Sequence, residues 1–265
     1  MKLPWPFRSR LADAASQPFP DAWTGFLDAN VKLYALLTPA EQARLRDDLR
    51  VFMGDKYWEG ALGFEITDEV KVTVSALACL LTVGFEQHDS FPNVETILVY
   101  PTAYQMPNVP VHLRRGVTVL DPTSNDTDPR LGEAHGIGPV VLSWEDVVAG
   151  GQSLTDGHNL VFHEFAHKLD FRDGYSDGVP YLRKRSDVDR WAAVMSAAFE
   201  MLVEDVTHHR HTILQPYGAT NAAEFFAVCT ECYYEKPVAM REKMPDLYDV
   251  LRGYYGIDWA ERMGG

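Results

Sequence analysis

The feature that most constrains this chain is a pair of histidines four residues apart, with a glutamate directly after the first, in His163-Glu164-Phe165-Ala166-His167. Four residues turn a helix by about 400°, so both imidazoles project from one helix face and can bind a single Zn²⁺ ion. The glutamate would lie beside that ion and could accept or return a proton. The pattern predicts a zinc site suited to metal-assisted hydrolysis.

The surrounding residues predict a helix that carries this motif, from residue 158 or 159 to about 171. Asn159 is the expected N-cap, and Gly174 follows the expected end, where glycine is favoured. Apolar side chains recur beside the histidines and supply a face for packing. In the alternative, both histidines are ordinary core or surface residues without a metal. The capped, amphipathic context and the placement of Glu164 favour the metal site.

Composition excludes several classes of protein. The chain has 265 residues, with 38 acidic against 24 basic side chains and a formal net charge of −14, which argues against a nucleic-acid binder or a protein of anionic membranes. The first ten residues lack the apolar stretch of a signal peptide, and the most apolar run, 70–83, is too short to cross a bilayer. We therefore expect a cytoplasmic protein that contacts neither nucleic acid nor membrane directly.

Capping signals and hydrophobic periodicity predict helices at both ends of the chain and short strands in the middle. The segment Thr38-Pro39-Ala40-Glu41 combines a capping box with proline at the first helical position, and opens a helix to about residue 53. Further helices are predicted at 21–37, 69–84, from 143 toward 151, at 186–203, from 220 or 221 to 234, and from 245. Strands are predicted at 94–100, 116–120 and 139–142, and an exposed loop at 121–138.

The three cysteines do not suggest a disulfide framework, because their number is odd and small. Cys229 and Cys232 form a CxxC pair, which would invite a redox or second-metal interpretation. No second cysteine pair exists, and both residues fall on a predicted apolar helix. We interpret them as buried packing residues.

A hydrolytic zinc site usually has three protein ligands, so a third ligand must lie elsewhere in the chain. Asp173 has the spacing of a metzincin ligand, but Asp170 stands where that motif needs a glycine for a sharp turn. The histidines at 208, 209 and 211 lie in a polar segment between predicted helices, which is typical of a solvated loop.

Glu224 is the third candidate, on a separate predicted helix. A glutamate from a second helix packed across the first would complete a two-histidine, one-glutamate site. Asn221 precedes it by three residues, so the two could instead form a simple capping box. The residues alone leave these two interpretations about equal.

Three segments, 162–170, 217–228 and 138–144, closely resemble the Mlc titration factor A family of bacterial zinc peptidases. The likeness extends to Pro4-Trp5-Pro6, Gly63-Phe64-Glu65 and Ile97-Leu98-Val99-Tyr100-Pro101, so it covers most of the chain and is weakest at 105–136. The expected fold is an α+β, mostly helical zincin of the gluzincin type with a small mixed sheet. We expect a single metallopeptidase domain over residues 1–265, in which 1–66 form a helical N-terminal extension packed on the zincin core.

The resemblance also implies the roles of individual residues. One zinc ion per chain would be held by His163, His167 and Glu224, with Glu164 as general base. Tyr217, seven residues before the glutamate ligand, would lie at the active site, as in this family and in the similar anthrax lethal factor catalytic domain. The implied activity is that of a cytosolic peptidase, aminopeptidase-like toward small peptides.

Asp170 is a candidate for a supporting role. It lies seven positions after His163, hence on the same helix face, and can orient a ligand imidazole or another inner-face group. A charge pair at the helix C-terminus, or plain solvent exposure, fits its position equally well. Residues 139–143 are likewise either an edge strand for an extended substrate or a structural core strand.

The resemblance leaves a second function open. At least one family member binds the glucose repressor Mlc, so the alternative is a regulatory binding protein that sequesters a transcriptional repressor, with or without peptidase activity. The expected partners are therefore a peptide or protein substrate and a transcriptional repressor. Glu164 and an open coordination position favour the enzyme, because a structural zinc site normally has four protein ligands and needs no base.

Overall fold

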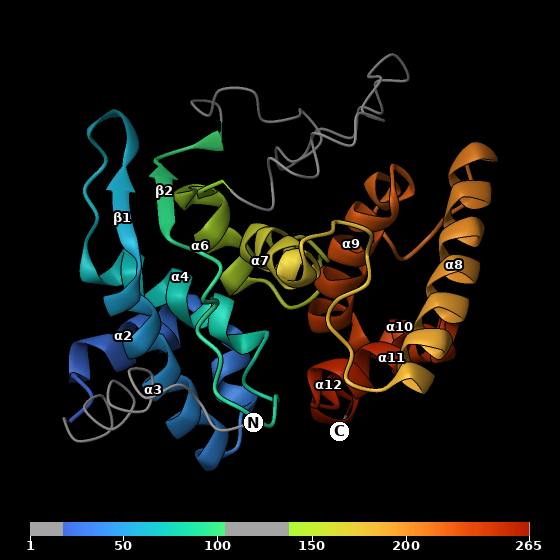
Figure 1. Ribbon diagram of the computed structural model, residues 1–265. Coiled ribbons are helices and arrows are strands. Elements are labelled where there is room, and N and C mark those ends of the chain that lie inside the picture. The colour runs from blue at the N-terminus through green and yellow to red at the C-terminus, as the bar shows by residue number, and fades with distance from the viewer. Residues whose placement is uncertain (1–17, 104–137, 265) are drawn as a thin grey trace.

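The computed structural model describes residues 18–103 and 138–264, in which helices predominate and three short strands form one sheet (Figure 1). Up to the sheet, the elements are α2 (Asp21–Asn30), η1 (Lys32–Leu36), α3 (Pro39–Asp55), β1 (Tyr57–Gly60), η2 (Ala61–Gly63), α4 (Asp68–Leu80), β2 (Thr96–Tyr100) and β3 (Val140–Ser143). They are followed by α6 (Trp144–Gln152), α7 (Leu160–Asp170), η5 (Phe171–Asp173), α8 (Arg185–Thr207), η6 (Pro216–Ala219), α9 (Ala222–Glu235), α10 (Pro237–Lys243), α11 (Pro245–Tyr255) and α12 (Trp259–Met263).

The sheet has the order β1-β2-β3, and both pairings are parallel. The expected sheet was mixed, whereas the strands that the structure describes run in one direction; the strand predicted at 116–120 lies outside the described residues, as does nearly all of the loop predicted at 121–138. Strand β1 was not predicted, because its short sequence Tyr-Trp-Glu-Gly is half exposed and has no apolar alternation.

Several helix boundaries differ from the predicted ones. The helix predicted at 21–37 ends at Asn30, whose buried amide donates to Glu69 and Thr73 in α4, and a 3₁₀ turn follows. Helix α4 ends at Leu80, four residues before the predicted end, and α8 continues to Thr207 instead of stopping near 203. Helix α11 begins at Pro245, as predicted. Helix α12, which follows it, was not predicted.

Local capping explains the boundaries that were predicted correctly. The Thr38 hydroxyl and the Glu41 carboxylate form the predicted reciprocal capping box at the start of α3. The Asn159 side chain accepts the Phe162 N–H at 3.1 Å and so caps α7. Beyond η5, Gly174 has φ +94°, a left-handed conformation that glycine adopts without steric cost.

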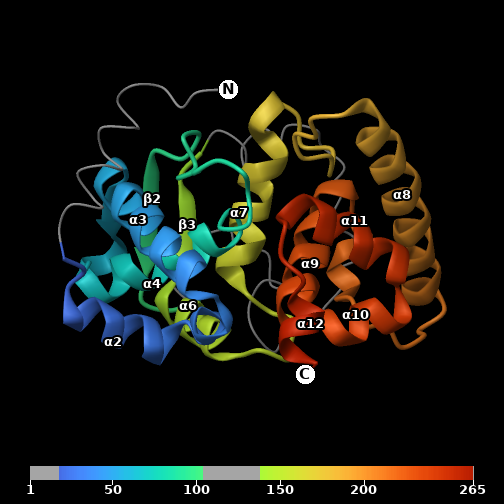
Figure 2. The same cartoon turned by 90° about the horizontal axis from the view of Figure 1, so that it is seen from below.

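Helix α7 occupies the centre of the molecule. The sheet and helices α2, α3, α4 and α6 lie on one side of it, and α8 to α12 lie on the other (Figures 1 and 2). Its principal partner is α9, and it also contacts α4, α6 and β3. Before residue 66, helices α2 and α3 pack on α4, and β1 pairs with β2. The division of the chain into an N-terminal extension and a core stays a prediction.

Aromatic rings join α7 to α3, to the loop before β2 and to α9. Phe165 contacts Phe52 of α3 and Phe91 of the loop before β2, with ring centroids 5.6 and 4.8 Å away. One turn earlier, Phe162 contacts Tyr234 of α9, with ring centroids 4.8 Å apart. All of these side chains are buried, so α7 joins the two halves of the hydrophobic core.

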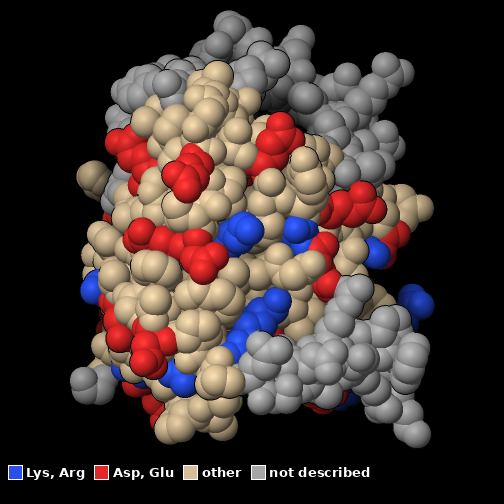
Figure 3. Space-filling view, turned by 90° about the vertical axis from the view of Figure 1, so that its left-hand side faces the viewer, with Lys and Arg blue, Asp and Glu red and all other residues tan. Residues whose placement is uncertain are grey.

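The three cysteines are free and buried, which confirms the packing interpretation. Acidic side chains are spread over the face formed by α2, α3 and β1, with Lys and Arg among them (Figure 3). None of the described helices combines the length and apolarity needed to cross a membrane.

Substitution of Phe52 by alanine should lower the free energy of unfolding by about 3–5 kcal/mol, because it removes a buried ring that α3 shares with the centre of the core. Urea denaturation followed by circular dichroism measures the change. The milder Phe52→Leu substitution should cost about 1–2 kcal/mol, since it keeps most of the buried volume. Equal losses in the two variants would contradict this account of the packing.

Candidate metal centre

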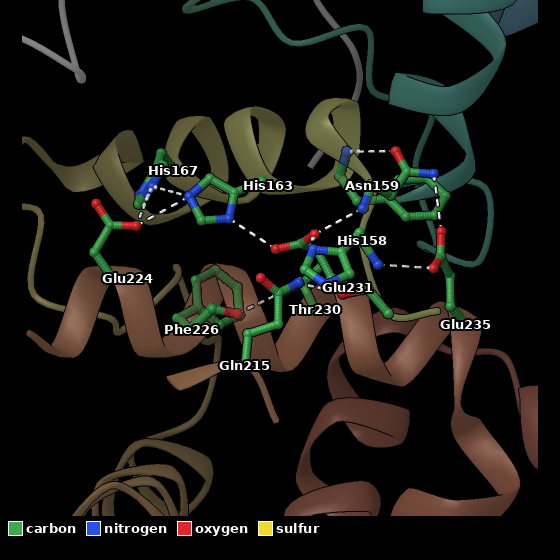
Figure 4. A network of polar contacts seen from close by, with 12 residues as sticks. His158, Asn159, His163, His167, Gln215, Glu224, Phe226, Thr230, Glu231 and Glu235 are labelled. Carbon is green, nitrogen blue, oxygen red and sulfur yellow. Dashed lines mark hydrogen bonds and ion pairs between the residues drawn. The ribbon is translucent and has the colours of Figure 1, made fainter. Parts of the chain in front are cut away.

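Two adjacent helices bring three potential metal ligands together. His163 and His167 project from α7 toward α9, whose first turn carries Glu224 (Figure 4). The His163 Nε2 lies 2.9 Å from the Glu224 Oε2 and 3.3 Å from the His167 Nε2. The third separation, between the His167 Nε2 and the Glu224 Oε2, is also 3.3 Å. All three residues are buried, so the cluster is largely shielded from solvent.

These separations fit a single ion. Zinc binds nitrogen and oxygen at about 2.0–2.1 Å, and two ligands at tetrahedral positions then lie about 3.3 Å apart. The three donor atoms are separated by 2.9–3.3 Å. The donor set of two imidazoles and one carboxylate is also the one found in hydrolytic zinc sites with an open position. The residues present therefore fit a metal ion.

The three candidates for the third ligand lie in different surroundings in the structure. Asn221 does cap α9, with its Oδ1 accepting the Glu224 N–H at 2.9 Å, but the Glu224 side chain turns toward the histidines. Asp173 is exposed and its Oδ1 accepts the Tyr175 N–H. The histidines at 208, 209 and 211 are exposed beyond the end of α8. Among the described residues, the cluster able to hold an ion is formed by His163, His167 and Glu224.

The charges of this cluster compensate one another. Burial alone would lower the pKa of His163, but hydrogen bonds to Glu224 and Glu231 outweigh it and hold this pKa well above its ordinary value. Burial would raise the pKa of Glu224, but His167 and His163 hold it well below its ordinary value. Metal ligands must be deprotonated, so a bound ion would take the place of any proton on these donor atoms.

Glu231 orients the first histidine. Its Oε1 accepts the His163 Nδ1–H at 2.8 Å, which leaves Nε2 directed at Glu224, and its Oε2 accepts the Asn159 N–H at 2.7 Å. A carboxylate on the second ring nitrogen fixes the tautomer and orientation of a ligand histidine. Glu231 was not predicted from the sequence. Its signal was the seven-residue spacing from Glu224, which places both carboxylates on one face of α9.

A third carboxyl group of α9 continues this row (Figure 4). The Glu235 carboxyl accepts the His158 N–H at 3.0 Å and the Asn159 side-chain N–H at 3.3 Å. Burial, reinforced by a hydrogen bond with Asp156, raises the pKa of Glu235 to about 9. Glu235 is therefore a neutral anchor at neutral pH, and it holds the segment that leads into α7.

The remaining two predicted catalytic residues flank the cluster. Glu164 follows His163 in α7 and, unlike the three candidate ligands, is partly exposed. Tyr217 lies in the short turn η6, and its ring stacks beside the His163 ring with centroids 6.0 Å apart. Gln215, just before this turn, donates to Glu231 at 3.3 Å and to the Gly157 carbonyl. The turn with Tyr217 is thereby tied to the network behind His163.

Asp170 is fully buried, which excludes the interpretation as a solvent-exposed residue. Its Oδ2 accepts the Gly178 N–H at 3.1 Å. Burial raises its pKa to about 7 despite that hydrogen bond. The contact thus connects the C-terminal end of α7 with the loop before α8, and a role in orienting a ligand imidazole stays a prediction.

The Glu235→Gln variant should lose a pH dependence of stability that the wild type has between about pH 5 and 9. Because the pKa of Glu235 is raised to about 9, the folded protein keeps a proton that the unfolded chain releases above its ordinary pKa of 4.5. The free energy of unfolding of the wild type should thus fall as the pH rises through this window, by up to about 1.4 kcal/mol per pH unit. Urea unfolding at pH 5, 7 and 9 measures this free energy in wild type and Glu235→Gln, with the exposed Glu200→Gln as control. Parallel profiles in wild type and Glu235→Gln would refute the assignment.

The chain is similar to known proteins over nearly its whole length. A model of the family described as glucose-regulated metallo-peptidase M90 matches residues 5–256. An uncharacterised protein of Synechocystis sp. is 35% identical over 245 residues, which cover 91% of this chain and 86% of that protein. Mlc titration factor A of Salmonella agona and of Salmonella gallinarum are each 28% identical over an alignment of 273 positions, which covers 98% of this chain and 94% of theirs. The family match spans nearly the whole chain and includes the three candidate ligands, and the chain therefore belongs to the glucose-regulated metallo-peptidase M90 family.

Proposed function

We propose that this protein is a zinc-dependent peptidase whose active centre is formed by His163, His167 and Glu224. The observation that carries the proposal is the convergence of one donor atom from each residue, all within 4.8 Å of one another, from two separate helices. Membership of a metallo-peptidase family supports the same chemistry. We further propose that the fold is a zincin of the gluzincin type and that one Zn²⁺ ion binds per chain.

Zinc bound to these three side chains would supply an open position for water, lower the pKa of that water toward about 7 and polarise a substrate carbonyl. Glu164 would accept a proton from the attacking water and later return it to the leaving amine. Its position directly after His163 and its partial exposure suit this task. The phenol of Tyr217 would donate a hydrogen bond to the carbonyl oxygen as negative charge develops there.

The supporting residues would keep this arrangement in place. Glu231 holds the His163 ring through its Nδ1–H, so that Nε2 stays directed at the metal position. Asp170 acts at the far end of α7 through the loop that it binds. We propose small peptides as substrates, with aminopeptidase-like cleavage, and a cytoplasmic location. These finer assignments rest on the family resemblance.

A regulatory function is the second candidate. Several of the similar proteins carry the name Mlc titration factor A, which describes an interaction with a repressor. The same role here would be sequestration of a transcriptional repressor, through a surface separate from the buried ligands. The two functions are distinguishable, because removal of the base Glu164 would abolish hydrolysis and leave repressor binding intact.

The main test of the enzyme measures zinc content and peptide hydrolysis together. Glu164→Gln should keep near-stoichiometric zinc and lose peptidase activity by at least about a hundredfold, because it removes only the base. Glu224→Ala should bind zinc much more weakly, whereas Asp173→Ala, which alters an exposed residue, should bind it normally. Normal turnover in Glu164→Gln would remove this residue from its role, and full zinc affinity in Glu224→Ala would remove the third ligand.

Tyr217→Phe keeps the ring that stacks on His163 and removes only the phenolic donor. A donor that acts in the transition state should affect kcat more than KM, so we expect kcat to fall about tenfold to a thousandfold with zinc content unchanged. Steady-state kinetics on one chromogenic peptide provide the measurement. If kcat equals that of the wild type, Tyr217 is a packing residue.

Glu231→Gln replaces the carboxylate behind His163 by an amide of the same shape. Loss of such a partner typically weakens metal affinity about 10- to 100-fold, because the imidazole becomes less basic and less well oriented. Competition with a fluorescent zinc chelator measures the affinity. Glu235→Gln, which alters the next carboxyl of the same row, should leave zinc affinity within about threefold of wild type, since it does not contact a ligand. Equal affinities in all three proteins would show that Glu231 does not support the metal.

A further inference from the structure

The turn at Gly178 joins three helices near the metal centre. Its N–H donates to the Asp170 carboxylate at the end of α7, with a distance of 3.1 Å. Its carbonyl accepts the Trp191 indole N–H of α8 at 3.0 Å. The residue is buried and has φ +77°, which favours glycine. Hydrogen bonds from two helices therefore fix this one residue in place.

The same residue lies against the start of α9. A Cβ built on Gly178 would lie 2.4 Å from the carbonyl oxygen of Ala222 and 2.9 Å from its carbonyl carbon. Ala222 is the first residue of α9 and precedes Glu224 by two positions. Because the close atoms belong to the backbone, a side chain at position 178 could be accommodated only by moving the first turn of α9 or the Gly178 turn itself.

We propose that Gly178 is a positioning residue that sets the spacing between α7, with two metal ligands, and the first turn of α9, with the third. Asp170 anchors the turn to the ligand helix, and the absence of a side chain lets α9 approach closely enough for Glu224 to reach His163. Metal–ligand distances vary by only about 0.2 Å, so even a small displacement of this turn would weaken binding. This inference rests on the proposed zinc function.

Gly174 provides a matched control in the same loop. It also has a positive φ, of +94°, but a Cβ there would meet no atom within 4 Å. An alanine at either position therefore carries comparable backbone strain. Only at position 178 would its Cβ also collide with the backbone of α9. The difference between the two variants isolates the contact with Ala222 from the general cost of a left-handed alanine.

The experiment measures zinc affinity by competition with a fluorescent chelator, together with the visible spectrum of the Co²⁺-saturated protein. Gly178→Ala should bind zinc about 10- to 100-fold more weakly than wild type and show an altered Co²⁺ spectrum, whereas Gly174→Ala should match wild type in both. A loss of thermal stability alone would not change the spectrum of the metal-saturated protein. Equal affinity and equal spectra in the two variants would overturn the proposal.

A second pair of variants serves if Gly178→Ala does not fold. Asp170→Asn and Asp170→Ala both remove the charge, but only asparagine keeps an oxygen that can accept the Gly178 N–H. We expect Asp170→Ala to lose zinc affinity about tenfold or more and Asp170→Asn to recover most of it. Equal losses in both variants would overturn the role of the turn. If the wild type itself binds no zinc, it is the proposed function that fails.

Discussion

The structure depends above all on the packing of α7 against α9, because this contact is both hydrophobic and polar. Phe162 and Tyr234 join the two helices in the core, while the polar faces meet through His163, Glu224 and Glu231. Carboxylates buried without partners would cost several kcal/mol each. Here every carboxyl group of the row faces an imidazole, an N–H group or another carboxyl group. The polar contacts thus fix the register in which the two helices meet.

That arrangement places a site for chemistry on rigid elements. Two of the proposed ligands occupy one face of a single helix, and the third lies in the first turn of its neighbour, capped by Asn221. The histidines are held from behind by Glu231, and the far side of α7 is held by Phe52 and Phe91. Side chains locked in this way need little reorganisation when a metal and a substrate bind, which is the condition for effective catalysis.

The two candidate functions place different demands on the molecule. Hydrolysis requires a base beside an open coordination position, and Glu164 is the partly exposed residue next to the first histidine. Sequestration of a repressor would require an outer surface of complementary shape and charge, whereas the ligands are buried. The two proposed roles would use separate parts of the protein and would be compatible in one chain. Family membership supports the first through its metallo-peptidase description and the second through the name of several relatives.

The amino-acid sequence by itself determined the features that depend on local spacing and capping. The capped helix with His163 and His167 on one face, and the start of α3 after its N-cap Thr38, follow from residues close together in the chain. Family membership follows from the sequence too, through a match over nearly the whole chain.

Only the tertiary structure decided which distant groups meet. The first turn of α9 carries the same Asn221 cap whether or not Glu224 faces the histidines, so helix packing had to select the third partner. Glu231 and Gly178 could not be predicted for the same reason, since each makes its contacts with residues of other helices. Helix ends such as Asn30 and strand β1 were likewise set by side-chain and ladder hydrogen bonds to remote segments, which no local pattern encodes.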